Sequence, residues 1–549
     1  MSEETKSTTS QPDTKPSVGT MGLVSLAVLS SRLLGLLREI LLAAFFGGEN
    51  RKWYECFLTA FRLPNMLRDL FAEGALSTAF VTTFSKTHKT DGEEAAWSLA
   101  RKMVTLTAVF MSLISLLGIV FAPWIVRAMS PGWVKDNADK VDYAIFLAQI
   151  MYPFILLVSL AALVMGMLNA RKVFGIPAMA STFFNIFSII FGAGLGWWFD
   201  PHFGKTALIG VSIGTLIGGL AQLVVQLPSL RRVGFRFRPD FAWRDPGVKK
   251  VLQLMVPSVI SGSVVQFNVF LNSCFASYIV NEMGKTDGPQ AWLNYSFRLI
   301  QLPLGIFGVV IATVTLPAIS RLATEGVTDA FKETLARSLK LVFLMTLPSA
   351  VGMAILAEEI IGVIYQHGRF DDYDTAMTAL ALRTYAWGLI FYAGIKIVQP
   401  AFYAIDRRFV PVLVSVVAVA VSAVSNWICV HKLHLGHEYL ALGTSLSAFV
   451  NFTLLMLALR RIGGPIQGSD LFSNMLKLLV SSAMLALVCW GAKQTVLTGF
   501  HHQPLYQQIV VLCVTIGVAA GVYFGMNIML KNKEVSEFSA ILKRKFLRK

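Results

Sequence analysis

Long apolar runs recur along almost the whole chain, and they limit its possible folds more than any other feature does. A helix needs roughly 20 mostly apolar residues to cross a bilayer, and we count about fourteen such candidate spans. The spans are 21–47, 53–85, 100–128, 143–169, 173–199, 206–229, 251–280, 290–318, 336–366, 376–404, 409–431, 439–459, 471–496 and 505–530. With only 15% charged residues and a mean hydropathy of +0.62, the chain is expected to be an all-α integral membrane protein.

Lysines and arginines gather in alternate connections between these spans. The richer connections hold, among others, Arg171, Lys172, Arg231, Arg232, Arg236, Arg238, Arg407, Arg408, Arg460 and Arg461, and the basic tail 536–549 follows the last span. This positive-inside bias predicts that both termini are cytoplasmic. Most of the net charge of +16 is therefore explained by topology, with anionic membrane lipids as the expected contact and no nucleic acid.

Two stretches of the chain repeat each other. Phe61-Arg62-Leu63 recurs as Phe297-Arg298-Leu299, 236 positions later, and a proline follows each of them closely. A weaker match joins the segments 170–177 and 404–411 at a similar offset. Six spans separate the matches, so orientation is preserved and the halves are expected to be parallel repeats. The predicted division is a disordered tail (1–20), an N-lobe (21–230), a basic linker (231–250), a C-lobe (251–462), two further spans (463–535) and the tail (536–549).

Charged residues inside these spans are the candidate functional groups. They are Arg32, Arg38 and Glu39 in span one, Glu55, Arg62, Arg68, Asp69 and Glu73 in span two, Arg298 in span eight, and Arg383 and Lys396 in span ten. A charge at the bilayer centre costs about 2.5–3.5 kcal/mol on insertion scales, so such residues normally face protein or an aqueous cavity.

The pattern favours different roles for different members of this set. For Asp69, Glu73, Arg383 and the Glu358-Glu359 pair, structural ion pairing is the favoured role, with function as the alternative. Arg32, Arg38 and Arg298 have few nearby acids on their own helices, and function is favoured. An excess of arginine indicates an anionic substrate, and the planar guanidinium suits phosphate.

Enzyme chemistry finds little support in the sequence. Neither His367 nor the pair His501-His502 has companion ligands or nucleophiles at catalytic spacing, and no Walker A loop is present. The five cysteines are scattered singly, and the polar residues Gln266, Asn268 and Asn272 of span seven are expected to form interhelical hydrogen bonds. We therefore expect a transporter without a cofactor.

Several motifs resemble those of the MurJ (MviN) lipid II flippase family. They are the run Ser31-Arg-Leu-Leu-Gly-Leu-Leu-Arg-Glu39, the run Phe61-Arg-Leu-Pro-Asn-Met-Leu-Arg68 with Phe71-Ala-Glu-Gly-Ala75, Arg298 with Pro303, Gly305 and Gly308, and Phe402-Tyr403-Ala404 with Asp406 and Pro411. The similarity covers nearly the whole chain after the first tail. Span two carries its most specific part.

The resemblance implies a member of the multidrug/oligosaccharidyl-lipid/polysaccharide exporter superfamily, with two six-helix lobes around a cationic cavity. Residues 463–535 would form a groove for a polyprenyl tail. The substrate would be lipid II, the undecaprenyl-pyrophosphate-linked peptidoglycan precursor, moved to the outer leaflet of the bacterial inner membrane. The family's cavity arginines fall on Arg32, Arg38, Arg68 and Arg298.

Two departures from the family pattern concern carboxylates. Glu39 and Glu55 stand where aspartate is usual, so each carboxylate reaches about one methylene further. Together with Arg62 they complete the expected cavity set, and Asp406 is a weak candidate for a sodium ligand. Coupling to membrane potential or to Na⁺ or H⁺, contact with cell-wall synthesis machinery and a monomeric state are further expectations. Alternative functions are a flippase for another polyprenyl-pyrophosphate-linked oligosaccharide, a drug/cation antiporter and a non-transporting membrane scaffold.

Overall fold

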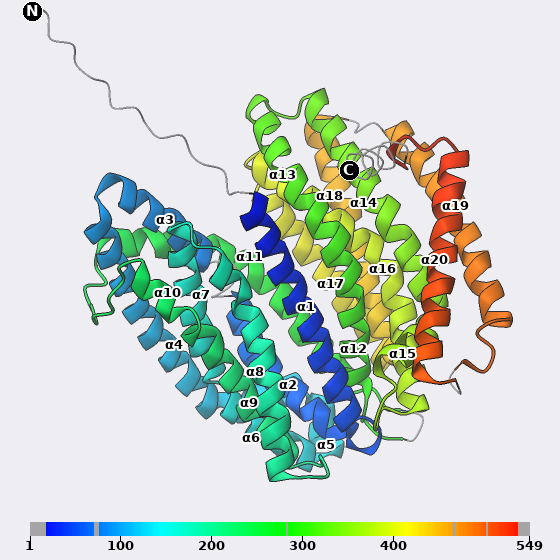
Figure 1. Ribbon diagram of the computed structural model, residues 1–549, viewed down its shortest axis with the longest axis horizontal. Helices are drawn as coiled ribbons and strands as arrows, with labels where there is room; N and C mark the ends of the chain where they lie inside the picture. Colours follow the sequence, from blue (N-terminus) through cyan, green and yellow to red (C-terminus); the bar gives the residue numbers. More distant parts are fainter. Residues whose placement is uncertain (1–17, 71–75, 282–283, 465–467, 501–502, 536–549) are drawn as a thin grey trace, which may run out of the picture.

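The computed structural model describes residues 18–70, 76–281, 284–464, 468–500 and 503–535, and these form a bundle of helices with short connections (Figure 1). Glu73, the C-terminal tail and residues 1–17 of the predicted N-terminal tail lie outside this part of the chain, whereas residues 18–20 of that tail are helical and begin the first helix. The first half contains α1 (Val18–Phe46), η1 (Gly48–Asn50), α2 (Arg51–Arg68), α3 (Ser77–Thr90), α4 (Glu93–Met129), α5 (Pro131–Asp136), α6 (Ala138–Met151), α7 (Phe154–Ala170), α8 (Gly175–Phe199), α9 (Ala207–Val224) and α10 (Leu227–Arg232).

The second half repeats this style of long helices. It contains α11 (Pro246–Ala276), α12 (Pro289–Pro303), the π-helical turn η3 (Leu304–Val309), α13 (Val310–Leu322), η4 (Ala323–Glu325), α14 (Asp329–Ile355), α15 (Ala357–Tyr365), α16 (Asp372–Ala404), α17 (Phe409–His431), α18 (His437–Gly463), α19 (Gly468–Gln494) and α20 (Leu505–Met529). The predicted all-α membrane fold is confirmed.

Eleven helical segments of the described chain are long and apolar enough to cross a membrane. The expected count of about fourteen is not established by this measure. The three predicted spans that miss it coincide with α1, with α2 and α3, and with α16. These helices carry most of the intramembrane charges, and charged residues lower the mean hydropathy of the segments that contain them.

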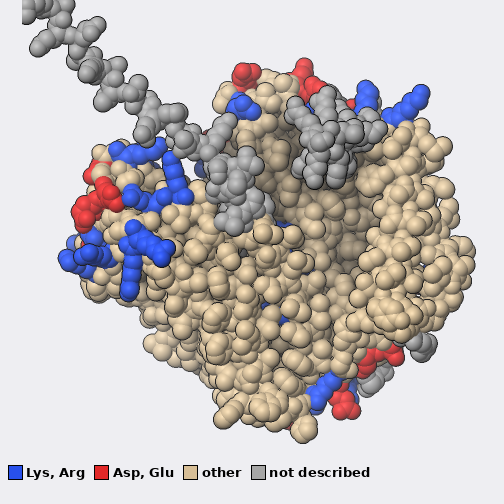
Figure 2. Space-filling model, in the orientation of Figure 1, with Lys and Arg blue, Asp and Glu red and all other residues tan. Residues whose placement is uncertain are grey.

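The helices form two groups that lean apart towards one end of the molecule (Figure 1). In the first group α8 packs against α9 and α1, and in the second α16 packs against α14 and α18. At the end where α1 begins, exposed lysines and arginines gather on both groups (Figure 2). We call this the basic end. Long α11 contacts α3 and α4 of the first group and then α17 of the second.

At the opposite end the two groups share one apolar core. Phe46 and Tyr54 from the first half pack with Tyr295, Tyr365 and Phe370 from the second, and all five are buried. The Tyr54 and Tyr295 rings are stacked with centroids 5.6 Å apart. We call this the sealed end, because buried apolar area across the lobes is what holds them together here.

A proline precedes a π-helical segment in each half. Pro64 lies inside α2, and the backbone takes π geometry at 69–70, while α12 ends at Pro303 and leads directly into η3. Proline cannot donate a backbone hydrogen bond, which favours a local change of helical pitch. The same device therefore follows both copies of the Phe-Arg-Leu repeat.

The last two helices are attached to the second half. Helices α19 and α20 pack on each other, and α19 also packs on α14. Ion pairs hold α19 at both ends: Lys340 of α14 pairs with Asp470, and Lys493 lies 3.3 Å from Glu358 and 3.2 Å from Glu359 of α15. Exposed apolar side chains on both helices, such as Leu487 and Val514, face outward as expected for lipid contact.

Candidate functional site: a cationic cavity between the lobes

A cavity of about 1200 Å³ lies between the two halves. Its walls come from α1, α2, α8 and α9 on one side and from α11, α12, α16 and α18 on the other. Six of its lining residues are cations and two are carboxylates: Arg32, Arg38, Arg62, Arg68, Arg298 and Lys396 against Glu39 and Asp69. The excess of four positive charges in a partly enclosed space favours an anionic occupant.

Glu39 neutralises one of these cations and connects the two halves. Its carboxylate lies 3.4 Å from the Arg38 guanidinium and accepts a 3.0 Å hydrogen bond from the Tyr54 hydroxyl. Asn294 of α12 donates to the same carboxylate at 3.4 Å. The Arg38 guanidinium also lies over the Phe184 ring, 5.2 Å from its centroid, which supports a cation by its π face. Arg38 is therefore held by two protein partners, Glu39 and Phe184.

Arg68 and Arg62 have partners as well. Arg68 forms a 2.9 Å ion pair with the adjacent Asp69, whose other oxygen accepts a 3.4 Å hydrogen bond from Gln266. Arg62 donates to the hydroxyl of Ser273 on α11. Helix α11 thus supplies polar groups to the α2 charges. The interhelical role predicted for Gln266 agrees with this contact.

Arg32 and Arg298 differ from the other cavity arginines. Among the described residues neither forms an ion pair or a hydrogen bond, although both side chains are half-buried. Lys396 on α16 is exposed into the cavity and has no such partner in the described chain. Partly buried cations without partners, such as Arg32 and Arg298, are costly, and Lys396 faces the same cavity, so these three groups are the best placed to receive an anion.

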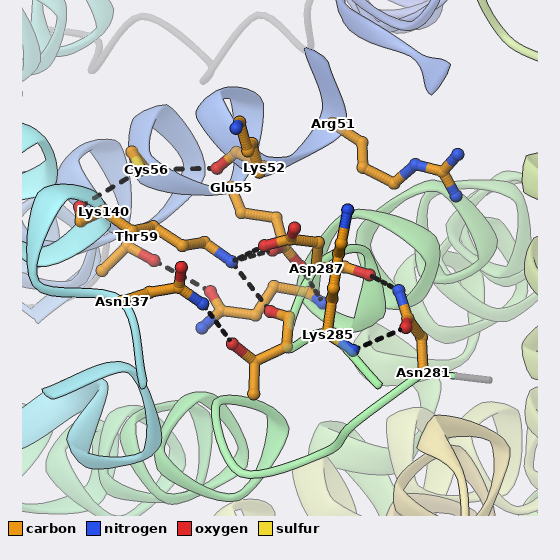
Figure 3. A network of polar contacts seen from close by, with 12 residues as sticks. Arg51, Lys52, Glu55, Cys56, Thr59, Asn137, Lys140, Asn281, Lys285 and Asp287 are labelled. Atoms are coloured by element: carbon orange, nitrogen blue, oxygen red, sulfur yellow. Dashed lines mark hydrogen bonds and ion pairs between the residues drawn. The ribbon is translucent and has the colours of Figure 1, made fainter. Parts of the chain in front are cut away.

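An ion network closes the sealed end next to the cavity (Figure 3). Lys140 of α6 lies 2.5 Å from Glu55 of α2 and 3.2 Å from Asp287, and it donates to the Thr286 carbonyl at 2.8 Å. The other Glu55 oxygen accepts a 2.7 Å hydrogen bond from the Gln290 backbone N–H. Glu55 is fully buried in this network and does not line the cavity, contrary to the sequence-based placement.

A second network joins η1 and α2 to the start of α16. Arg51 lies 3.1 Å from Asp374 and 3.3 Å from Asp371. Asp374 also accepts hydrogen bonds from the Gly48 N–H and the Trp292 indole, both at 2.7 Å. Gly48 has φ of 60°, a conformation suited to glycine, which lets its N–H point across the lobe boundary.

Several charges singled out in the sequence lie elsewhere. Arg383 pairs with Glu358 at 2.9 Å beside Lys493, which fits the structural role favoured for these residues. The Asp406 carboxylate is 84% exposed and pairs with Arg408 at 3.1 Å. Within the described ranges no group of three or more His, Cys, Asp or Glu side chains could hold a metal ion.

Sequence reasoning missed the partners that close the sealed end. Lys140, Asp287 and Asp374 were not among the candidate residues, and each of them contacts a partner 85 or more positions away along the chain. In the sequence, these three residues are marked only by their position next to the end of a predicted span. No alternation or spacing rule connects residues that meet across two lobes.

Two helical lobes around a buried cationic cavity define a multi-pass membrane protein of the two-lobe transporter class. Solved structures share this fold. A lipid II flippase MurJ in an inward closed conformation matches with TM-score 0.72 at 24% identity, covering 92% of this chain and 99% of that one. An inward-facing multidrug resistance MATE family transporter of the MOP superfamily matches with TM-score 0.65 at 16% identity, covering 80% and 97%.

Sequence comparisons narrow the class to one family. The family model described as lipid II flippase MurJ matches residues 42–510. The lipid II flippase MurJ of Burkholderia cenocepacia is 33% identical over 92% of this chain and 95% of its own length. A probable lipid II flippase MurJ of Vibrio cholerae is 32% identical over 79% and 81%. The chain belongs to the MurJ lipid II flippase family, and the resemblance seen in its motifs is confirmed.

Proposed function

We propose that this protein moves lipid II from the cytoplasmic to the outer leaflet of the bacterial inner membrane. The observation that carries the proposal is the surplus of cations in the interlobe cavity, with Arg32, Arg298 and Lys396 lacking partners in the described chain. Lipid II carries a pyrophosphate between its sugars and its polyprenyl tail. Guanidinium groups bind phosphate oxygens in pairs, so the arginines and the pyrophosphate are chemically matched.

The cavity is also large enough for a bulky head group. Pockets for drug-sized ligands are about 300–1,000 Å³ in volume, and this cavity exceeds that range. Asparagine and glutamine side chains such as Asn65, Asn272 and Gln301 line it beside the arginines. These amides offer donors and acceptors for sugar hydroxyls and peptide groups.

The closed sealed end suggests the direction of entry. If the basic end is cytoplasmic, as the positive-inside bias predicts, the head group enters the cavity from the cytoplasm and stops at the Lys140 and Arg51 networks. Transport then requires those networks to open and the basic end to close. The tail would stay in the bilayer or against α19 and α20.

The energy source and assembly state belong to the same proposal. Membrane potential, or a Na⁺ or H⁺ gradient, would bias the cycle, because moving net charge across the potential changes its free energy. A single chain contains both lobes and the whole cavity, so a monomer suffices. Contact with the cell-wall synthesis machinery remains an expectation of the family resemblance.

The proposal is tested by measuring lipid II on the outer face of cells that depend on this protein. We expect Arg298→Ala at matched expression to reduce exposed lipid II at least tenfold, with lipid II accumulating inside. Arg298→Lys keeps the charge and is expected to retain part of the activity. Arg408→Ala is the control, because this arginine is 72% exposed and lies outside the cavity. Unchanged exposure in Arg298→Ala would contradict the proposal.

A further inference from the structure

The two unpartnered arginines each lie against a glycine on the opposite lobe. A Cβ added at Gly35 of α1 would lie 2.5 Å from an Nη atom of Arg298, and one added at Gly305 of η3 would overlap the Arg32 guanidinium. Arg32 itself belongs to α1, and Arg298 belongs to α12, which leads into η3. Each side of the lobe boundary therefore contributes one arginine that packs against a glycine of the other side: Arg298 packs against Gly35, and Arg32 packs against Gly305.

We propose that Gly35 and Gly305 are positioning residues that hold the Arg298 and Arg32 guanidinium groups in place for an anionic head group. The inference rests on the proposed function and deepens it. Each glycine leaves a gap of one methyl group in a helix surface, and the opposite guanidinium fills that gap. The contact fixes where the two free cations point before any ligand arrives.

The local structure explains why only glycine at positions 35 and 305 leaves room for the opposite guanidinium group. Both glycines are buried, and both have helical backbone geometry, so conformational freedom is not the reason for glycine here. A methyl group would occupy the volume of the guanidinium. Because the atoms it meets are the far end of a flexible side chain, the helices can keep their places while the arginine head swings away.

The π-helical form of η3 adds to this arrangement. Gly305 is the second residue of η3, and the π turn widens the helix where Arg32 approaches. Neither Arg32 nor Arg298 has a hydrogen bond or ion pair within the described residues, so a head-group phosphate would be the first charged partner of either guanidinium.

The first test compares glycine substitutions in the full-length protein purified in detergent. We expect Gly35→Ala and Gly305→Ala each to weaken lipid II binding about tenfold, measured by native mass spectrometry, while the melting temperature changes little. Gly194→Ala in α8 and Gly352→Ala in α14 are matched controls, because a Cβ at either position meets nothing within 4 Å. Binding equal to wild type in both test variants would overturn the inference.

A double-mutant cycle adds a readout that general helix damage would not move. Arg298→Lys removes the Nη atom that a methyl group added at Gly35 would meet, so Gly35→Ala is expected to weaken binding much less in that background than in wild type. Gly305→Ala should likewise couple with Arg32→Lys. The crossed pairs, Gly35 with Arg32 and Gly305 with Arg298, should be additive. Equal coupling in all four pairs would mean that the glycines serve helix packing only.

The two proposals fail in different ways. If wild-type protein does not bind lipid II, the proposed function is wrong and inorganic pyrophosphate becomes the probe for the same cycles. If wild type binds lipid II and Arg298→Ala abolishes binding, but the glycine pairs show no specific coupling, only the positioning inference is overturned.

Discussion

Lys140 lies 2.5 Å from Glu55 at the sealed end, and both side chains are withdrawn from solvent, at 3% and 0% exposure. The pair joins α2 to α6 within the first lobe. Asp287 and the Gln290 N–H bring the second lobe to the same two groups. One buried ion pair therefore organises a contact between the lobes.

Removing one partner of this pair should strongly destabilise the sealed end. Breaking a buried ion pair costs about 3–5 kcal/mol because one charge stays buried without compensation. We expect Lys140→Met and Glu55→Gln each to lower the melting temperature clearly in detergent, and the double variant to recover part of the loss. Lys135→Met, at an exposed position on α5, is the control. Additive losses in the double variant would argue against direct coupling.

The Arg51 network should control opening of the sealed end. Asp374→Asn removes the charge that faces Arg51 across the lobes while keeping the shape of the side chain. We expect Asn50→Cys in this background to react several-fold faster with a membrane-impermeant maleimide than in the wild-type background. Asp372→Asn, an exposed acid in the same helical turn, is the matched control. Equal labelling rates in all three proteins would show that the network does not hold the lobes together.

Glu39 should matter for both stability and transport. Its carboxylate accepts hydrogen bonds from the Tyr54 hydroxyl and the Asn294 amide and pairs with Arg38. Hydrogen bonds to a charged group contribute about 1.5–3 kcal/mol each to stability. We expect Glu39→Gln to lower lipid II exposure in dependent cells at least tenfold. Lipid II exposure in Glu39→Asp should lie between that of wild type and that of Glu39→Gln, because the aspartate side chain keeps the charge but is one methylene shorter. Full activity of Glu39→Gln would show that transport does not require a negative charge beside Arg38.

Asp245, which caps α11 just outside the membrane-spanning segment, predicts a pH effect. Burial alone would raise the pKa of its carboxyl, but hydrogen bonds from Lys102 and from the Gly247 N–H outweigh burial and lower that pKa. The carboxylate therefore contributes stability above the usual aspartate pKa of about 4, and this contribution is lost as pH falls through the lowered value. We expect the difference in melting temperature between wild type and Asp245→Asn to be constant from about pH 8 to 5 and to shrink below about pH 4. A difference that persists at lower pH would assign the effect to helix capping alone.

The apolar runs predicted an all-α membrane fold, because a bilayer imposes one length and one polarity on any helix that crosses it. The exact number of spans is not established by the eleven apolar helical segments of the described chain. The depth of each charge was harder to predict. Glu55 and Arg62 share a helical face, but seven residues advance a helix by about 10 Å, which places Glu55 at the sealed end and Arg62 at the cavity. The shared helical face therefore did not reveal that Glu55 and Arg62 lie at different depths along α2.

Partners across the lobes could not be predicted from one sequence. The contact between Gly35 and Arg298 joins positions 263 apart, and no local pattern encodes it. Arg32 and Arg298 were favoured as functional because few acids lie near them on their own helices. What each of them touches depends on how two lobes dock, and that follows from the summed packing of many side chains.

Ion pairs at both ends of α19 have a consequence for motion. Lys340 and Lys493 attach this helix to α14 and α15, so α19 and α20 should travel as one rigid unit with the second lobe. When the lobes rock against each other, an apolar chain resting on these helices would be carried through the same arc as the second half of the cavity. Head and tail of a lipid substrate would then turn together, which spares the polar head from crossing the hydrocarbon while its tail stays behind.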